Sequence, residues 1–558
     1  MAQPNPEPSP TPPPWPHCGH GTTAADPVGC RGVRVGEHAA CLAHLDEAAR
    51  AAYLAALSSG ADIDHRGTPF TGDLSARLLD ALRDPATGRP CFGGARFRQA
   101  VFEGDADFGS VTFKGHADFG SAVFEGYADF ERAAFGEEAG FWSAVFKGYA
   151  NFESATFEGY AGFGAAVFGR DIVFEAAVFR GDAGFVETVF EQTATFGPLV
   201  CAGRMVLSGA VFGAPVTLLL AARRLECRRT RWSSTAEVRL RYATVDFSHA
   251  VFEHPLTIAA EADPFVLPDG GVVAERALAG TPGATVRLAS LRGVDAAHLV
   301  LADVDLSRCL FTGTVHLDQL RLEGACSFGT VPSGTHRVRG RPVRFTRRRI
   351  LAEEHHWRAR RPGAVRGWNA AVFGAGNAGP AQLAPVYRAL RKALEDGKNE
   401  PDAADFYYGE MEMRRHDTTR PRGERALLTA YWAVSGYGLR AVRALAWLGA
   451  AMLATVVLLM GFGIPQDSPK QEATGTVPPG GGRVTFTIDR ADPVNPTGDR
   501  FTGERFDKAL GVTLNSVAFR SSGQYLTTFG TYTEMASRLA EPVLLGLAVL
   551  AVRNRVRR

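Results

Sequence analysis

Residues 119–146 read FGSAVFEGYADFERAAFGEEAGFWSAVF, and the same pattern extends from Phe97 to Leu218. Phenylalanine returns at intervals that alternate between five and six residues, and a small residue, usually Ala, precedes most of these rings by two positions. The unit is F-[EK]-G-x-A-x-F-x-x-A-x, eleven residues long. A helix would scatter these rings, and a flat strand would place them on alternate faces. A coil that turns every five or six residues returns each ring to its inside, so the spacing predicts a solenoid.

The repeat resembles the pentapeptide-repeat family, whose units carry a large central residue and a small residue two positions earlier. It is similar to a Phe-rich variant with five- and six-residue units. The resemblance implies a right-handed quadrilateral β-helix with four short faces per coil. Because every second unit has one extra residue, a coil should take about 22 residues. Stacked Phe rings would form the core, Ala or Cys would fill the tight site beside each ring, and glycines such as Gly104, Gly126 and Gly148 would permit the corners.

The repeat also sets domain boundaries. Residues 92–330 are expected to form the β-helix, with an irregular insertion around 219–290, because seven arginines between positions 223 and 241 interrupt the Phe pattern. Residues 45–91 contain two short amphipathic segments and predict a helical cap, since solenoids need polar-faced ends. The Pro-rich residues 1–16 predict a disordered tail rather than a signal peptide.

Residues 17–44 hold three of the eight cysteines and four histidines. The spacing C-x11-C-x10-C-x2-H, formed by Cys18, Cys30, Cys41 and His44, is compatible with a tetrahedral Zn2+ site. Such a zinc knuckle would allow a segment too short for its own core to fold. A loose, reduced Cys/His-rich leader is the alternative. Three other cysteines fall on core positions of the repeat and are expected to be reduced: Cys201, Cys309 and Cys326.

Charge is distributed unevenly although the net charge is only +2. Residues 95–220 contain 16 acidic and 8 basic residues, whereas residues 337–366 contain 11 arginines and 2 glutamates. Residues 331–380 are therefore interpreted as a basic helix and linker. Its arginines could contact anionic lipid headgroups, contact nucleic-acid phosphate, or pack beside the acidic β-helix. Lipid or intramolecular pairing is favoured because a membrane segment follows.

Residues 381–416 show two aromatic stripes at helical spacing and predict a helical hairpin with a joint at 397–401. The resemblance to membrane-associated pentapeptide-repeat proteins implies that this hairpin lies beside the membrane and acts as a coupler. Residues 417–443 are expected to form an interfacial helix that carries aromatic anchors.

Two C-terminal segments are candidates for transmembrane helices. Residues 444–464 contain no charge and are long enough to span a bilayer. Residues 535–552 form a weaker candidate because they contain Arg538 and Glu541. Arginines before the first segment and in the basic tail 553–558 place both ends in the cytoplasm and residues 465–534 outside it.

The outer segment invites a pore hypothesis. Some relatives resemble two-helix potassium-type channels with the filter T-x-G-Y-G-D, and Thr527–Glu534 begins similarly but lacks the Gly after Tyr and the Asp. The outer residues 465–534 thus contain either a degenerate re-entrant segment or an interfacial helix over residues 507–519.

The sequence contains no Ser/His/Asp arrangement, phosphate loop or paired-carboxylate cleft that predicts an enzyme. The preferred hypothesis is a non-enzymatic, membrane-anchored scaffold or protein-binding module on the cytoplasmic face of a bacterial inner membrane. It would contact the lipid bilayer and a cytosolic protein, and no nucleic acid is expected. One alternative is an ion-channel-like protein with a cytosolic sensor. The other is a DNA mimic that binds a topoisomerase, as some acidic relatives do, which the basic segments and the membrane tether disfavour.

Overall fold

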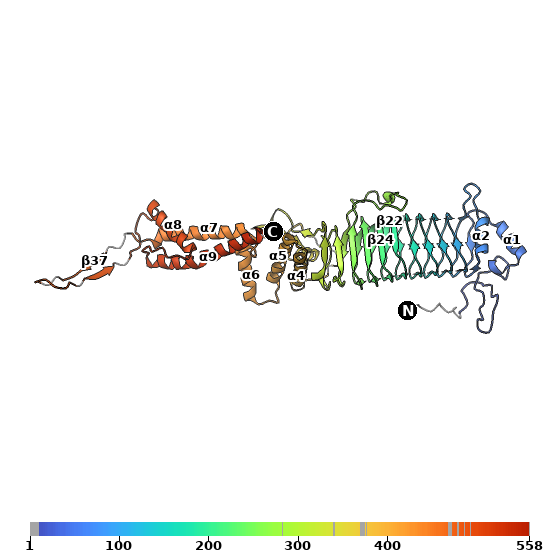
Figure 1. Cartoon of the computed structure of the whole chain (residues 1–558), viewed down its shortest axis with the longest axis horizontal. Coiled ribbons are helices and arrows are strands. Elements are labelled where there is room, and N and C mark those ends of the chain that lie inside the picture. The colour runs from blue at the N-terminus through green and yellow to red at the C-terminus, as the bar shows by residue number, and fades with distance from the viewer. Residues whose placement is uncertain are drawn as a thin grey trace. The chain divides into compact units, whose positions relative to one another are not determined.

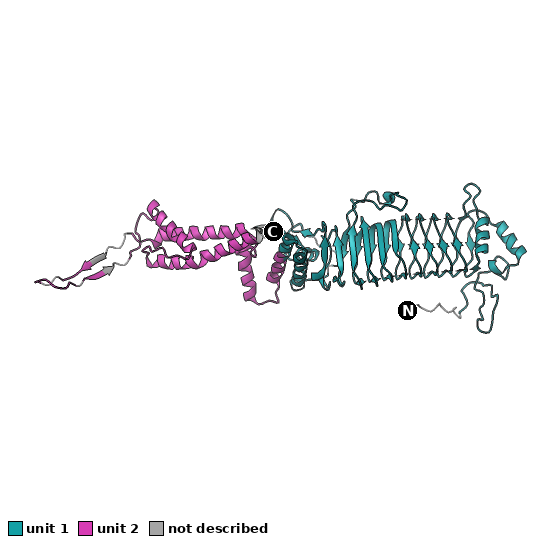
Figure 2. Ribbon diagram, in the orientation of Figure 1, with its two compact units in different colours: residues 1–406 teal, residues 407–558 magenta. Residues whose placement is uncertain are grey.

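The chain falls into two compact units, residues 1–406 and residues 407–558 (Figure 2). The first ten residues of the predicted Pro-rich tail and the last two residues of the predicted basic tail lie outside the described residues. The computed structural model describes residues 11–281, 283–338, 341–368, 374, 376–466, 471–476, 479–484, 486–490 and 493–556.

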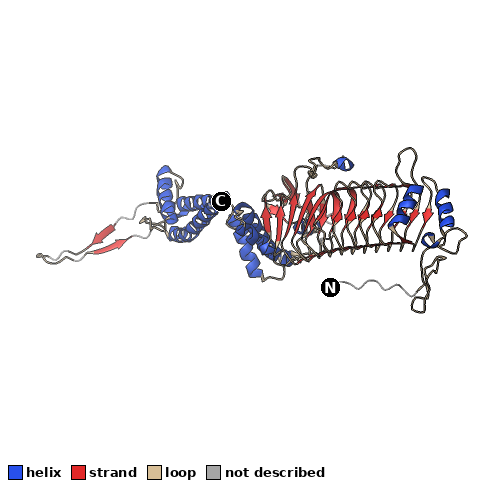
Figure 3. Ribbon diagram, turned by 45° about the vertical axis from the view of Figure 1, so that its right-hand side comes forward, coloured by secondary structure: helices blue, strands red, loops and turns tan. Residues whose placement is uncertain are grey.

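Unit 1 is built around a β-solenoid of about 11 turns (Figures 1 and 3). From β3 (Cys91–Phe92) to β21 (Val189–Phe190), every strand is two residues long. Strands one coil apart pair in parallel, as β13 (Val145–Phe146) does with β17 (Val167–Phe168). From β4 (Ala95–Arg96) onward in this region paired residues are 22 positions apart, and four such ladders run along the solenoid. The predicted coil length and the four faces are therefore confirmed for this region.

Phenylalanine fills the inside of these coils. Rings one coil apart lie parallel, as in Phe119 and Phe141, whose centroids are 5.0 Å apart with an interplanar angle of 2°. Rings on neighbouring ladders meet edge to face, as in Phe119 and Phe130 at 5.5 Å and 85°. Aromatic pairs of this kind contribute about 0.5–1.5 kcal/mol beyond the burial of their area. The core is thus a lattice of rings held by two kinds of contact.

The coil has two kinds of corner, and the glycines lie at one of them, as expected: Gly104, Gly126 and Gly148 each fall in a bend between two short strands. The other kind of corner has a left-handed backbone position that recurs every eleven residues and is occupied by non-glycine residues: Gln99, Ser110, Ser121, Arg132, Ser143, Ser154, Ala165, Ala176 and Glu187. At the bends, glycine allows adjacent coils to approach. A Cβ on Gly126 would lie 2.8 Å from the carbonyl carbon of Gly104, and one on Gly148 would lie 2.2 Å from the carbonyl oxygen of Gly126.

Beyond residue 194 the strands become longer and the coil becomes shorter. Strand β22 (Thr195–Val206) has 12 residues and β24 (Val216–Glu226) has 11. The parallel pairs Val211 with Arg231 and Arg231 with Val251 are each 20 positions apart. One coil therefore uses two residues fewer here than in the Phe-rich region.

The arginine-rich run does not interrupt the solenoid, so the predicted insertion at 219–290 is too wide. Strand β26 (Ala236–Arg241) pairs with both β24 and β29 (Leu256–Ala260), and its Val238 and Leu240 are fully buried on either side of the exposed Arg239. The insertion is confined to the loop after β29. This loop contains a short 3-10 helix (Glu275–Leu278) and packs on the solenoid through Phe265, Val273 and Leu278.

The solenoid begins at residue 63, not at residue 92. Strands β1 (Ile63–Asp64) and β2 (Pro69–Phe70) already pair with coil strands, and Phe70 stacks on Phe102 at 5.2 Å. Two helices lie at this end, α1 (Glu47–Ala56) and α2 (Gly72–Ala81) (Figure 1). Because α2 is inserted after β2, the first coil does not show the repeat period, which explains the misplaced boundary.

At its other end the parallel ladder finishes with β31 (Leu299–Ala302), β32 (Arg321–Glu323) and a bridge at Ser327, close to the predicted residue 330. Antiparallel strands and then helices follow. The expected basic helix is present as the shorter α3 (Ala352–Ala359), and the expected hairpin is present as α4 (Pro380–Asp396) and α5 (Glu400–His416). Antiparallel pairs join β33 (Gly329–Thr330) to β36 (Arg349–Ile350) and β34 (Thr335–Val338) to β35 (Arg341–Arg344).

Unit 2 is mainly helical. Two of its helices, which lie side by side, are long and apolar enough to cross a membrane, over Ala441–Gly463 and Thr528–Arg553 (Figure 1). The second starts seven residues before the predicted span at 535. The elements are α6 (Arg422–Ser435), α7 (Ala441–Leu458) with a π-helical turn (Leu459–Gly463), β37 (Gln471–Thr474), β38 (Thr487–Arg490), α8 (Gly503–Val517) and α9 (Thr528–Val556).

Candidate metal centre and arginine groove

The four residues with zinc-ligand spacing come together in the structure. Ligand atoms of Cys18, Cys30, Cys41 and His44 all lie within 4.8 Å of one another. The Sγ atoms of Cys30 and Cys41 are 3.7 Å apart, and the Sγ of Cys41 is 3.3 Å from Nδ1 of His44. Two thiolates bound to one tetrahedral Zn2+ at about 2.3 Å would be roughly 3.7 Å apart. The Cys3His cluster is therefore compatible with structural zinc.

Local backbone geometry positions these ligands. Cys41 immediately precedes a 3-10 turn (Leu42–His44), which places His44 on the same side as the Cys41 thiol. Cys18 and Cys30 lie on paired segments joined by the hydrogen bonds Cys18 N to Gly32 O and Gly19 N to Cys30 O. A Cβ on Gly32 would lie 2.7 Å from the Cys41 sulfur, so only glycine permits this approach.

The pKa values of two thiols in the cluster are shifted in opposite directions. The hydrogen bond with Cys41 lowers the pKa of Cys30 to about 5, and the same bond raises the pKa of Cys41. A cluster that readily releases a proton from one thiol suits a metal, which binds thiolates rather than thiols. The cluster also joins the leader to the solenoid, since Val33 N donates to the carbonyl oxygen of Arg66 in the first coil.

A groove on the second half of the solenoid was not predicted. We call it the arginine groove; its volume is about 1140 Å3, and it lies over β24, β27 (Thr244–Asp246), β30 (Arg287–Ser290) and the turns after them. Six arginines and three carboxylates line the groove, which therefore has a net charge of +3. The arginines are Arg224, Arg228, Arg229, Arg287, Arg292 and Arg308.

Sequence reasoning missed the groove because its arginines are up to 84 positions apart. The run from 223 to 241 was the only signal, and it was interpreted as a break in the repeat. The other groove arginines reach the same surface because coils of about 20 residues stack, which brings the turn after β24 beside the turns of later coils.

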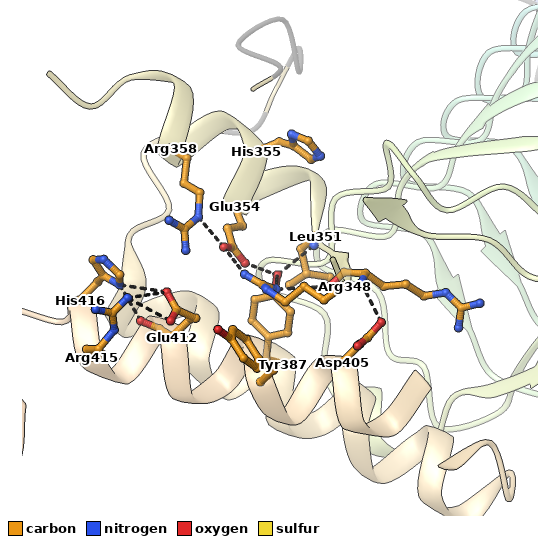
Figure 4. A network of polar contacts seen from close by, with 12 residues as sticks. Arg348, Leu351, Glu354, His355, Arg358, Tyr387, Asp405, Glu412, Arg415 and His416 are labelled. Carbon is orange, nitrogen blue, oxygen red and sulfur yellow. Dashed lines mark hydrogen bonds and ion pairs between the residues drawn. The ribbon is translucent and has the colours of Figure 1, made fainter. Parts of the chain in front are cut away.

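A buried polar network closes the C-terminal end of the solenoid (Figure 4). The fully buried Glu354 accepts hydrogen bonds from Arg348, from the Tyr387 hydroxyl and, at 2.6 Å, from Nε of Arg358. Burial opposes ionisation, but the two guanidinium groups outweigh it and lower the pKa of Glu354 to about 2. The adjacent Glu353 accepts from the backbone N–H of Phe311 at 2.6 Å, which ties α3 to the last coil.

The network engages some of the arginines of the basic segment 337–366. Arg348 and Arg358 pair with Glu354, and Arg349 pairs with Asp402, so these three arginines are engaged within unit 1. Intramolecular pairing is thus the correct alternative for them. Because its members are largely buried and hydrogen-bond to one another, the network is best understood as a structural lock.

The two candidate membrane helices expose their large apolar side chains. Leu453 of α7 is 65% exposed, and Leu539 and Val543 of α9 are 74% and 61% exposed. The inward face combines apolar residues such as Leu459 with polar ones, and Thr455 Oγ1 donates a hydrogen bond of 2.8 Å to Glu541 Oε1. Only 33% and 28% of the two apolar windows are buried, so most of each window faces outward.

The segment compared with a potassium filter is helical. Thr528 to Thr533 form the first turns of α9, and the N–H of Thr531 donates to the carbonyl oxygen of Thr527 at 2.9 Å. A filter needs carbonyl groups that face a pore, whereas these are engaged in the helix. Close packing places Gly530 against Gly463, where a Cβ on Gly530 would lie 2.4 Å from the Gly463 oxygen. The expected helix at 507–519 is present as α8, shifted by a few residues.

Comparison with known proteins identifies the repeat. Residues 92–134 match the family described as Pentapeptide repeats (9 copies). No curated protein and no solved structure matches the chain. The matched residues form the first regular coils, and the parallel ladders continue from them through residue 323. The solenoid of this chain is therefore a pentapeptide-repeat solenoid.

Proposed function

We propose that this protein is a non-enzymatic scaffold, anchored in a bacterial inner membrane by α7 and α9, whose solenoid presents a binding surface to a cytosolic protein. The observation that carries the proposal is the outward display of large apolar side chains by both helices, such as Leu453 and Leu539. In water this surface would promote aggregation, whereas in a bilayer it meets hydrocarbon.

Charge supports an orientation with both ends of the chain in the cytoplasm. Five arginines precede the first span between residues 420 and 443, and four more occupy residues 553–558. Positively charged residues near the ends of spans are retained on the cytoplasmic side. Two crossings then place α8 and the β37–β38 hairpin outside the cytoplasm.

The membrane anchor is tested by extraction of membranes with alkaline carbonate. The full chain should remain in the pellet after extraction. The double variant Leu453→Arg/Val543→Arg should be released from the pellet or fail to insert, because each arginine costs about 2.5–3.5 kcal/mol at the centre of a span. Leu427→Arg is the matched control, since Leu427 is 71% exposed on α6, outside both spans. Carbonate release of the unaltered chain would refute the anchor.

We also propose that the Cys3His cluster holds a structural Zn2+ that fastens the leader to the first coil. The four converging ligand atoms support this. Purified protein should release about one zinc ion per chain on thiol modification. Cys30→Ser should abolish that release, whereas Cys326→Ser, at a cysteine outside the cluster, should not. Equal release from both variants would refute the zinc site.

The alternative functions have less support. A channel would need a filter conformation at residues 527–533, which are helical at all but the first position. In liposomes shown to contain inserted protein, we expect no ion flux, and flux abolished by deletion of residues 530–532 would overturn the scaffold proposal. The DNA-mimic hypothesis suits the acidic coils of residues 95–220 but not the arginine groove that follows them.

A further inference from the structure

We propose that the arginine groove binds a ligand that carries several phosphate groups. This inference goes beyond the scaffold function and does not depend on the membrane anchor. It rests on how the guanidinium groups of the groove are held and on which of their donors remain free.

Three of the groove arginines are fixed by carboxylates through Nε. Arg224 contacts Glu226 at 2.9 Å, Arg228 contacts Asp246 at 2.7 Å and Arg287 contacts Asp305 at 2.9 Å. The carboxylate side chains are only 11–15% exposed, whereas the arginine side chains are 40–54% exposed. Contact through Nε leaves the Nη groups for a ligand. These arginines are therefore oriented before any ligand arrives, which reduces the entropic cost of binding.

Two further arginines carry charge that the protein does not neutralise. The side chains of Arg229 and Arg308 are exposed, and neither has an ion-pair or hydrogen-bond partner among the residues that the structure describes. The sixth, Arg292, donates to the carbonyl oxygen of Gly374 at 2.5 Å and keeps its charge. Unpaired cations beside oriented ones produce a local positive potential that attracts anions.

Phosphate is the anion that this arrangement fits best. A phosphate group offers three acceptor oxygens and takes guanidinium donors from several directions, whereas a carboxylate offers two oxygens in one plane. The arginines come from successive coils, which are about 4.8 Å apart. A volume of about 1140 Å3 exceeds what one phosphate needs. A ligand with several phosphates would therefore meet several arginines at once.

Binding of inorganic triphosphate to the purified full chain in detergent tests the proposal, with isothermal titration calorimetry at about 0.15 M salt. We expect measurable binding and at least a roughly tenfold rise in Kd for the double variant Arg229→Ala/Arg308→Ala. The matched control is Arg98→Ala/Arg170→Ala, which removes two exposed arginines outside the groove that have no side-chain partner among the described residues. Both variants keep the cysteine cluster, so chelation of metal there affects them equally.

Competition then separates the sources of phosphate. Displacement of labelled triphosphate by a short-chain phosphatidylinositol bisphosphate, which carries several phosphate groups, more readily than by inorganic triphosphate would identify a lipid headgroup as the ligand, and the reverse order would identify a soluble polyphosphate. Citrate should compete weakly. The proposal is overturned if triphosphate does not bind, if the control variant loses as much affinity as the groove variant, or if citrate competes as well as triphosphate. In each case carbonate extraction still tests the membrane anchor independently.

Discussion

The two halves of the solenoid enclose their cores in different ways. Between residues 95 and 194 each coil has 22 residues and a Phe ring on each of its four ladders, and its surface is acidic. After residue 194 most coils have 20 residues and a mainly aliphatic core, with one aromatic ladder of Phe212, Trp232 and Phe252. Four rings need a wider cross-section than aliphatic side chains, so the extra residue in every second unit is a consequence of core size.

The comparison also teaches where binding sites can arise. In the Phe-rich half all faces are short strands of similar outline, and exposed charges are scattered. In the second half the strands are longer, and the stacked arginine-bearing turns produce a charged groove. The first half therefore has a uniform surface along its length, whereas the second half carries a groove with a net positive charge.

The largest expected effect comes from removing one ring of the lattice. Phe152 stacks on Phe130 at 4.8 Å and on Phe174 at 5.2 Å, and it meets Phe141 and Phe163 edge to face at 5.5 Å. Phe152→Ala should lower the free energy of unfolding by about 3–5 kcal/mol. Chemical denaturation of the full chain in detergent measures this. The control Lys147→Ala, at a surface position, should change it by less than about 1 kcal/mol; a similar loss in both would show that the rings do not hold the coils.

A second prediction concerns two buried titratable groups, one near each end of the solenoid. Burial lowers the pKa of His65, beside the first coil, to about 4, and the network of Figure 4 lowers that of Glu354 to about 2. Both groups bind protons more weakly in the folded protein, so for each of them the fold is more stable at neutral pH than in acid by up to about 3 kcal/mol. The contribution of His65 is lost as pH falls from 6.5 towards 4, and that of Glu354 as pH falls from 4.5 towards 2.

Acid should therefore loosen the N-terminal end before the C-terminal end. Hydrogen exchange at pH 5 should increase around residues 63–70 while residues 348–358 remain protected. His65→Phe, which cannot be protonated, should reduce the increase. Earlier opening of the C-terminal network would contradict the prediction.

A third prediction tests the link between coil length and ring size. Leu240, fully buried in a 20-residue coil, should not tolerate a ring. Leu240→Phe should destabilise the solenoid by about 1–3 kcal/mol through overpacking, whereas the volume-conserving Leu240→Met should cost less than about 1.5 kcal/mol. Thermal unfolding of both variants decides the matter. A stabilising Leu240→Phe would show that the shorter coil is not narrower.

The smallest effect concerns the left-handed corner. Ser154 has a φ of 55° in the Phe-rich half, and the equivalent corner two coils and eleven residues later is Gly209. A non-glycine residue costs about 1–2 kcal/mol in this conformation, part of which glycine loses again as unfolded-state entropy. Ser154→Gly should therefore stabilise by up to about 1 kcal/mol, and Gly209→Ser should destabilise by a similar amount. Identical signs for the two variants would contradict this account.

The repeat by itself determined the coil, its 22-residue length and the Phe core, because each depends on neighbours at a fixed sequence separation. The two apolar spans followed from the length and composition of two C-terminal segments. The sequence also predicted the Cys3His set, because the spacing of its four ligands suits one metal ion. Tertiary structure alone decided the rest. The first coil at residue 63 is hidden by the inserted α2, and the close approach between coils at glycines such as Gly148 depends on stacking. Arg229 and Arg308 share a groove only because coils stack, and stacking joins residues at distances that no periodic pattern in the sequence encodes.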